Sequence, residues 1–189
     1  MEKGNRKQKA NLVMTAASIA AFAHNDQKRK VDNTPYIFHP MAVAQKLACA
    51  GISDEAIIAA ALVHDVLEDT DYSEDKLREE LGDDAIDIVK TLTADNTLPW
   101  PEKKKKYAQN VKNGSAAVKM VALADKITNL ENLLEAHKKQ GKAVWDRFNA
   151  PREQKIRFEE EMLAIFKEAL NDPLVADYEI LIAKVKALE

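Results

Sequence analysis

Apolar residues recur along this chain mostly at spacings of three and four, the pattern of helices with one buried face. In the first such stretch the apolar positions are Leu12, Ala16, Ile19 and Ala23. No segment alternates apolar and polar residues strictly enough to predict a β-strand. Glycine and proline, which most often interrupt helices, occur only five and six times. The pattern therefore predicts an all-α protein, a bundle of roughly eight to ten helices.

Breaks in this pattern divide the chain into the expected helices. Ser53 or Asp54, Ser73 and Ser115 are suited to cap helix N-termini, because their side-chain oxygens can accept the free N–H groups there. The proline-containing segment 98–101 is a rigid break between two helices. The predicted helices cover approximately residues 7–28, 40–51, 54–68, 73–82, 84–93, 102–112 and 116–134, with two more after Pro151 and around Pro173.

Composition narrows the class of protein. Charged residues make up 31% and apolar residues 46% of the 189 residues, a balance typical of a folded globular chain. The net charge of −3 argues against a dedicated nucleic-acid binder but not against a phosphorylated small molecule as partner. Cys49 is the only cysteine, and no apolar run approaches the roughly 18 residues of a membrane helix. We therefore expect a cytoplasmic protein that binds neither membrane nor nucleic acid, and leave its oligomeric state open.

The strongest chemical signal is the stretch 60–70, where a histidine and three acids follow a run of apolar residues. On a continuous helix, His64, Asp65, Glu68 and Asp69 would fall within about 140° of one another. Acids crowded beside a core repel one another and are poorly solvated, so they require a cation. A lone His–Asp pair is more often a solvated helix end, and the prediction of a metal therefore depends on two further residues.

Those two residues are His39 and Asp125. His39 precedes a proline at an expected helix start, and Asp125 lies in the apolar segment 120–127, where an unpaired carboxylate would be costly. Two histidines and two aspartates make a mixed nitrogen and oxygen site, which suits Mn²⁺, Fe²⁺ or Zn²⁺ and poorly suits Ca²⁺. The expected metal ligands are His39, His64, Asp65 and Asp125.

The order His39, then His64-Asp65, then Asp125 resembles the H…HD…D signature of the HD phosphohydrolase superfamily. The resemblance is closer to one branch, the ppGpp hydrolase domains of RelA/SpoT-type proteins, and to its short members, the small alarmone hydrolases that include the metazoan SpoT homologue. Five stretches carry it: 23–30, 34–40, 60–70, 91–99 and 123–130. It implies a single HD hydrolase domain over residues 1–189, with its motifs at about 10–170 and a C-terminal helix at about 173–188.

The resemblance also implies a role for each matching residue. The four ligands would hold one Mn²⁺ ion, with another divalent transition metal as an alternative, and Glu68 and Asp69 would position and deprotonate the attacking water. Asn129 would hydrogen-bond the nucleoside sugar, and Arg29 and Lys30 would meet the base and the phosphates. The implied activity is (p)ppGpp 3′-pyrophosphohydrolysis, in which water activated at the metal attacks the 3′-diphosphate and releases pyrophosphate and GDP or GTP.

Two alternatives stay open. The metazoan relatives make a nucleotide phosphatase acting on NADPH or an adenine alarmone the first alternative. A helical sensor that binds its nucleotide without cleavage is the second, although it would have no use for Glu68 and Asp69. Related short members carry an Arg and a Tyr four residues apart after a Trp. That pair is missing after Trp145, where Phe148 or Phe158 is the candidate to replace the ring.

The remaining conspicuous residues have structural interpretations. The run Lys103–Lys106 is predicted to be a solvated helix face, which is the usual setting of such a run. His24 is predicted to be a hydrogen-bonded structural histidine on the inner side of the first helix, and Trp100 and Trp145 to be packing residues.

Overall fold

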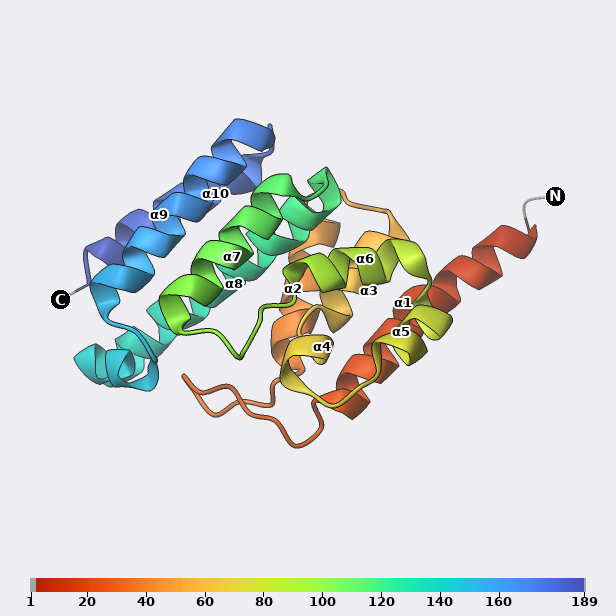
Figure 1. Cartoon of the computed structure of the whole chain (residues 1–189), viewed down its shortest axis with the longest axis horizontal. Coiled ribbons are helices and arrows are strands. Elements are labelled where there is room, and N and C mark those ends of the chain that lie inside the picture. Colours follow the sequence, from red (N-terminus) through yellow and green to blue (C-terminus); the bar gives the residue numbers. More distant parts are fainter. Residues whose placement is uncertain (1–2, 189) are drawn as a thin grey trace.

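The computed structural model describes the backbone of residues 3–188 and the side chains of residues 12–188. This part of the chain contains ten α-helices, one 3₁₀ helix and no β-strand (Figure 1). The elements are α1 (Lys3–Ala23), α2 (Phe38–Cys49), α3 (Glu55–Val63), α4 (Val66–Asp69), α5 (Glu74–Leu81), α6 (Asp83–Leu92), α7 (Trp100–Asn113), α8 (Ala116–Gln140), η1 (Gly141–Arg147), α9 (Arg152–Ala169) and α10 (Pro173–Lys186). The all-α prediction is confirmed.

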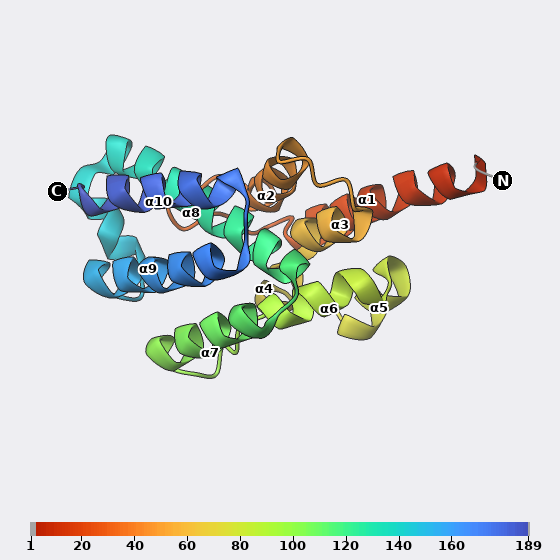
Figure 2. The same cartoon turned by 90° about the horizontal axis from the view of Figure 1, so that it is seen from above.

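Helix α8 lies at the centre of the molecule. Every side chain from Val118 to Thr128 is buried, so this half of the helix is enclosed on all sides. Helices α2, α10 and η1 make its most extensive contacts, and α10 and α9 lie side by side at one end of the molecule (Figures 1 and 2). A helix enclosed in this way is normally apolar all round. Asp125 and Lys126 are charged exceptions, and they need partners inside the protein.

Helix α3 is the second buried element, and it brings the two histidines of the motif together. The residues from Ala59 to Val63 are all buried apolar residues, and three of them are alanines, which let neighbouring helices approach closely. Helix α3 contacts α1, α2, α6 and α8. As a result the end of α3, where His64 lies, meets the first turn of α2, where His39 lies. None of the described helices is long and apolar enough to cross a membrane.

The helix caps follow the local sequence. The side chains of Asp54, Ser73 and Ser115 each accept a backbone N–H bond at the start of α3, α5 and α8. These three caps were expected, and they are confirmed, with Asp54 acting in place of its neighbour Ser53. Helix α8 continues beyond its expected end to Gln140, where Gly141 takes a φ of 60°. This left-handed conformation is one that glycine adopts readily at a helix end.

The first correction concerns the end of α1. This helix ends at Ala23, whereas the pattern of apolar residues predicted that it would continue for another turn. The backbone that follows turns back on itself: the Tyr36 N–H donates to the Gln27 carbonyl over 2.9 Å, and the Arg29 N–H donates to the Thr34 carbonyl over 2.8 Å. These backbone hydrogen bonds replace those that a continuing helix would make. The spacing of apolar residues in 24–28 could not reveal them.

The second correction concerns the helix expected over residues 54–68. It is broken in two, with α3 ending at Val63 and α4 beginning at Val66. The ring Nδ1 of His64 lies 2.8 Å from the carbonyl oxygen of Ala61 and donates its proton to it, thereby satisfying a carbonyl at the end of α3. The prediction of one continuous helix is therefore wrong at residues 64 and 65, although both keep right-handed helical backbone angles.

Candidate functional site

One cavity of about 440 Å³ gathers every side chain that the sequence predicted for chemistry. Its walls come from the loop after α1, the break between α3 and α4, helix α7 and the middle of α8. The predicted residues that line it are Arg29, Lys30, His39, His64, Asp65, Glu68, Asp69, Asp125 and Asn129. Glu68 and Asp69 on α4 line the same cavity as His64, although residues 64 and 65 separate α4 from α3.

Two histidines and two aspartates converge within this cavity. His39 lies in the first turn of α2, His64 directly after α3, and Asp125 in the middle of α8, and one ligand atom from each lies within 4.8 Å of the others. The Asp65 Oδ2 atom approaches the same histidines, 3.0 Å from the His64 Nε2 and 3.6 Å from the His39 Nε2. The His39 Nε2 lies 3.1 Å from the Asp125 Oδ1. Donor atoms from three segments of the chain, the first turn of α2, the break between α3 and α4 and the middle of α8, therefore converge.

The state of His64 tests whether these donors fit a metal. Its Nδ1 proton is given to the Ala61 carbonyl, so Nε2 is the nitrogen that faces the cluster. That Nε2 is buried and faces carboxylate oxygens of Asp65 and Asp125 at 3.0 and 3.8 Å. Burial opposes a second proton on the ring, but these two carboxylates outweigh it and raise the pKa of His64 well above its usual value. A lone pair opposite two carboxylates is stable only with a proton or a cation between them. Two imidazoles and two carboxylates are a donor set that suits a divalent transition metal.

Both carboxylates of the cluster keep their charge despite burial. Burial would raise the pKa of Asp125, but the ammonium of Lys126, 3.0 Å from its Oδ2, and the two histidines hold that pKa well below its usual range. Burial likewise opposes ionisation of Asp65, and His64 outweighs it and lowers the pKa. The hydroxyl of Tyr36 donates to the Asp65 Oδ2 over 2.6 Å and further stabilises the anion. Anionic carboxylates are the form that binds a metal.

The two other acids lie on α4 and are held in different ways. The Glu68 Oε2 accepts a hydrogen bond of 3.0 Å from the backbone N–H of Ala94, in the loop between α6 and α7. Burial raises the pKa of Glu68, which makes its carboxylate a stronger base than that of an exposed glutamate. Asp69 accepts its hydrogen bond from a side chain, the amide of Gln27, over 3.0 Å. The stretch 91–99, which contributed to the resemblance, thus supports Glu68 through its backbone.

The three residues expected to hold the nucleotide line the cavity in different settings. Asn129 donates to the Asp125 Oδ1 over 2.6 Å, and its own carbonyl accepts from the Arg29 guanidinium over 3.0 Å. Arg29 is therefore tied to α8 through Asn129, although the two residues are one hundred positions apart. Lys30 lines the cavity as an exposed side chain.

Lys104 corrects the interpretation of the lysine run. Its side chain is half-buried and lines the cavity, with its ammonium 5.1 Å from the centre of the Phe158 ring, while Lys105 and Lys106 are exposed. Burial and the nearby ammonium of Lys126 lower the pKa of Lys104 to about 8. The prediction of a solvated face is wrong for this residue. The signal was present in the sequence, because Tyr107, the apolar residue three positions on, faces the same side of α7.

The structure also distinguishes between the two candidate aromatic residues, Phe148 and Phe158. Phe148 lines the cavity, and the ammonium of Lys155 lies 4.1 Å from the centre of its ring. Phe158 is buried and packs against Trp100 and Tyr107, with ring centres 6.3 and 6.2 Å away. Only Phe148 is therefore placed to meet a ligand in this cavity. Tyr36, which sequence reasoning placed in a motif without a role, is a second ring on the cavity wall.

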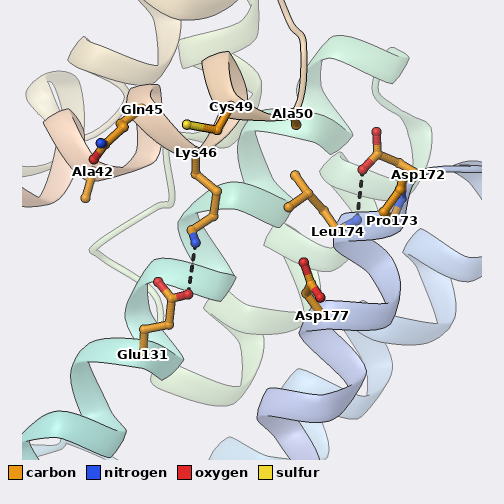
Figure 3. A pocket seen from close by; sticks show the side chains of 10 residues that line it. All are labelled: Ala42, Gln45, Lys46, Cys49, Ala50, Glu131, Asp172, Pro173, Leu174 and Asp177. Carbon is orange, nitrogen blue, oxygen red and sulfur yellow. Dashed lines mark hydrogen bonds and ion pairs between the residues drawn. The ribbon is translucent and has the colours of Figure 1, made fainter.

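A larger cavity of about 590 Å³ lies elsewhere, between α2, α8 and α10 (Figure 3). Its lining contains no histidine, and three of its four charged groups already have partners: the Lys46 ammonium lies 2.9 Å from Glu131, and Asp172 caps the first turn of α10 at the Leu174 N–H. Its size alone does not indicate a catalytic function, and the smaller cavity is the candidate active site.

Comparisons of sequence relate this chain to known proteins. A profile of the HD domain family matches residues 16–168. The guanosine-3′,5′-bis(diphosphate) 3′-pyrophosphohydrolase MESH1 of Xenopus tropicalis is 41% identical over 126 residues, which are 66% of this chain and 70% of that protein. Human MESH1 is 40% identical over the same shares. A guanosine-3′,5′-bis(diphosphate) 3′-pyrophosphohydrolase of Aquifex aeolicus is 35% identical over 132 residues, 67% of this chain and 18% of that longer protein.

Solved structures show the same relationship. The structure described as a metazoan ortholog of SpoT that hydrolyzes ppGpp and plays a role in starvation responses superposes with a TM-score of 0.80 at 29% identity, covering 94% of this chain and 96% of that one. The Listeria monocytogenes protein lmo0812 superposes with a TM-score of 0.72 at 30% identity, covering 78% of this chain and 97% of that one. The chain therefore belongs to the HD domain family, in the branch that contains the metazoan SpoT homologue.

Proposed function

We propose that this protein is a metal-dependent (p)ppGpp 3′-pyrophosphohydrolase. The observation that carries the proposal is the convergence of His39, His64 and Asp125, whose donor atoms lie within 4.8 Å of one another, in a cavity that also contains two further acids. The curated relatives that share 35–41% of aligned residues with this chain carry that activity in their names. We also propose that residues 1–189 form one domain, because buried apolar side chains from α1 to α10 belong to one core cluster.

The proposed metal ligands are His39, His64, Asp65 and Asp125, and the proposed ion is Mn²⁺. The mixed nitrogen and oxygen donors and the anionic carboxylates support this choice. A bound divalent ion lowers the pKa of water and neutralises charge on the attacked phosphate. Because Cys49 is the only cysteine, we further propose that the enzyme works in the cytoplasm, where thiols stay reduced.

The proposed proton acceptors are Glu68 and Asp69. Water attacks the phosphorus nearest the ribose, the bond from that phosphorus to the 3′ oxygen breaks, and pyrophosphate leaves together with GDP or GTP. Glu68 is suited to take the water proton, because burial raises its pKa towards neutrality and strengthens it as a base. The Ala94 N–H holds one oxygen of this carboxylate, which leaves the other to accept the proton.

The proposed nucleotide contacts lie around the rim of the cluster. Arg29, Lys30 and Lys104 place three cationic side chains around a cavity that must accept two diphosphate groups. Asn129 is proposed to bind the sugar and Phe148 to lie against the base, since aromatic rings stack well on purines. The volume of about 440 Å³ lies within the usual range for small-ligand sites.

A substrate panel tests the proposal. Protein loaded with Mn²⁺ is assayed with ppGpp, NADPH and an adenine alarmone, and pyrophosphate and phosphate are measured separately. We expect the highest kcat/KM for ppGpp, pyrophosphate as the product, and complete loss of turnover with excess chelator. A clear preference for NADPH with phosphate release would replace the proposal by the first alternative. Tight ppGpp binding without turnover would replace it by the sensor.

A further inference from the structure

His24 is a buried polar residue that the chemistry above does not use. It follows α1 directly, and only 1% of its surface is exposed. Its ring lies against Tyr36, with ring centres 4.8 Å apart, and Tyr36 in turn holds Asp65. The predicted hydrogen bond is confirmed, because the His24 Nδ1 lies 2.6 Å from the Gln27 Oε1, but the residue lies just after α1 and not on it. Among the described residues its buried Nε2 has no hydrogen-bond partner, so the ring makes its polar contact there through Nδ1.

A second hydrogen bond joins Gln27 to Asp69. The Gln27 Nε2 lies 3.0 Å from the Asp69 Oδ2, and among the described residues it is the one hydrogen-bond donor to that carboxylate. An amide has a donor end and an acceptor end, and an ionised carboxylate only accepts. Gln27 can therefore serve Asp69 only if its oxygen points away, and that oxygen must then find a donor. The His24 Nδ1 lies 2.6 Å from that oxygen and, in the tautomer with its proton on Nδ1, is that donor, which holds the donor end of the amide towards Asp69.

We propose that His24 and Gln27 are a pair of positioning residues that aim the Asp69 carboxylate at the attacking water. This inference rests on the proposed function, which makes Asp69 one of the two proton acceptors. Glu68 is held by a backbone N–H, whereas Asp69 depends on this chain of two side chains. A misplacement of about 1 Å in such a group can lower a rate by as much as a hundredfold.

Variants of Gln27 test the hydrogen bond from Gln27 to Asp69. Gln27→Glu keeps the shape of the side chain and removes the donor, and we expect kcat to fall about tenfold to a hundredfold while KM and metal content stay within about twofold. Gln109→Glu is the matched control, because it makes the same charge change at an exposed position of α7 outside the cavity. Gln27 is only half-buried, so both variants should fold. An unchanged kcat in Gln27→Glu would overturn the proposal.

Variants of His24 test the hydrogen bond from His24 to Gln27. His24→Asn keeps an N–H donor close to the position of the imidazole Nδ1 and should stay within about threefold of the wild-type kcat. His24→Leu fills the space without a donor and should lower kcat about tenfold. Equal losses in the two variants would mean that His24 only packs, and the pair would be rejected.

A double-mutant cycle separates positioning from general structural damage. If Gln27 acts through Asp69, then Gln27→Leu should lower kcat in the wild type but change it by less than about twofold when Asp69→Asn is already present. A structural defect would lower kcat by the same factor in both backgrounds, and that additive result would contradict the inference. The cycle can use any substrate of the panel that is turned over, so a wrong substrate assignment leaves it intact.

Crystal structures give a readout that does not depend on activity. If no nucleotide is hydrolysed, the proposed function fails, and the pair is judged by the position of Asp69 alone. We expect the Asp69 carboxylate to move in His24→Leu and to keep its position in His24→Asn. A carboxylate that stays in place in both variants would overturn the positioning role.

Discussion

Lys104→Met should stabilise this protein at neutral pH, although it removes a side chain from the candidate active site. The wild-type ammonium is half-buried on α7, beside the aromatic ring of Phe158 and close to the ammonium of Lys126. Burial and Lys126 lower the pKa of Lys104 from 10.5 to about 8. The fold therefore disfavours the charge of this lysine, while the unfolded chain tolerates it. Methionine keeps the apolar stem and its contact with the rings.

The magnitude follows from the change in pKa. One pKa unit corresponds to about 1.4 kcal/mol, so a shift from 10.5 to about 8 amounts to about 3 kcal/mol at most. Because the side chain keeps some contact with solvent, which screens its charge, we expect about 2 kcal/mol. Below about pH 8 lysine is charged in both states, and the penalty is fully present. It is relieved between about pH 8 and 10.5, where only the unfolded state still binds the proton.

Urea unfolding over a range of pH measures this effect. At pH 7 the unfolding free energy of Lys104→Met should exceed that of the wild type by about 2 kcal/mol, and the difference should shrink to zero by about pH 10.5. Other titrating groups largely cancel in the difference. Lys105→Met, on the exposed face of the same helix, is the control and should change stability by less than about 0.5 kcal/mol. A destabilised Lys104→Met, or a difference that does not vary with pH, would refute the reasoning.

Four further predictions concern the proposed chemistry. His64→Ala should lose both bound metal and turnover while the circular dichroism stays helical; wild-type metal content in that variant would exclude His64 as a ligand. Glu68→Gln and Asp69→Asn should keep the metal and lose roughly two to four orders of magnitude in kcat. Because burial raises the pKa of Glu68, the acidic limb of the wild-type kcat profile should lie above the ordinary glutamate pKa of 4.5. Arg29→Ala and Lys30→Ala should raise KM about tenfold and change kcat less; a fall in kcat at unchanged KM would instead place them in the chemical step.

Features that depend on neighbouring residues alone could be predicted from the sequence. The caps at Asp54, Ser73 and Ser115 follow from a side-chain oxygen placed before an apolar run, and that interaction spans only three residues. The all-α class follows from the spacing of apolar positions, which also needs no knowledge of distant contacts. These predictions agree with the structure because local geometry determines them.

The group of chemical side chains was also predictable, for a different reason. His39 and Asp125 are polar residues in settings where burial without a partner would be costly, and the order of motifs resembled a known family. The structure brings them together with His64 within 4.8 Å. Their roles as ligands and the roles of the two acids on α4 stay predictions until the variants are measured.

The sequence by itself therefore determined the helical class, the helix caps and the histidines and acids that meet in the cavity. Only the tertiary structure decided how they meet. It showed that the ring of His64 bonds a carbonyl at the end of α3, that Lys104 faces inward while Lys105 does not, and that Gln27 lies between His24 and Asp69. Each of these facts depends on contacts between elements that are separate in the chain, or on one side chain displacing a backbone bond. Periodicity and residue type carry no information about such contacts, because both are properties of a single segment.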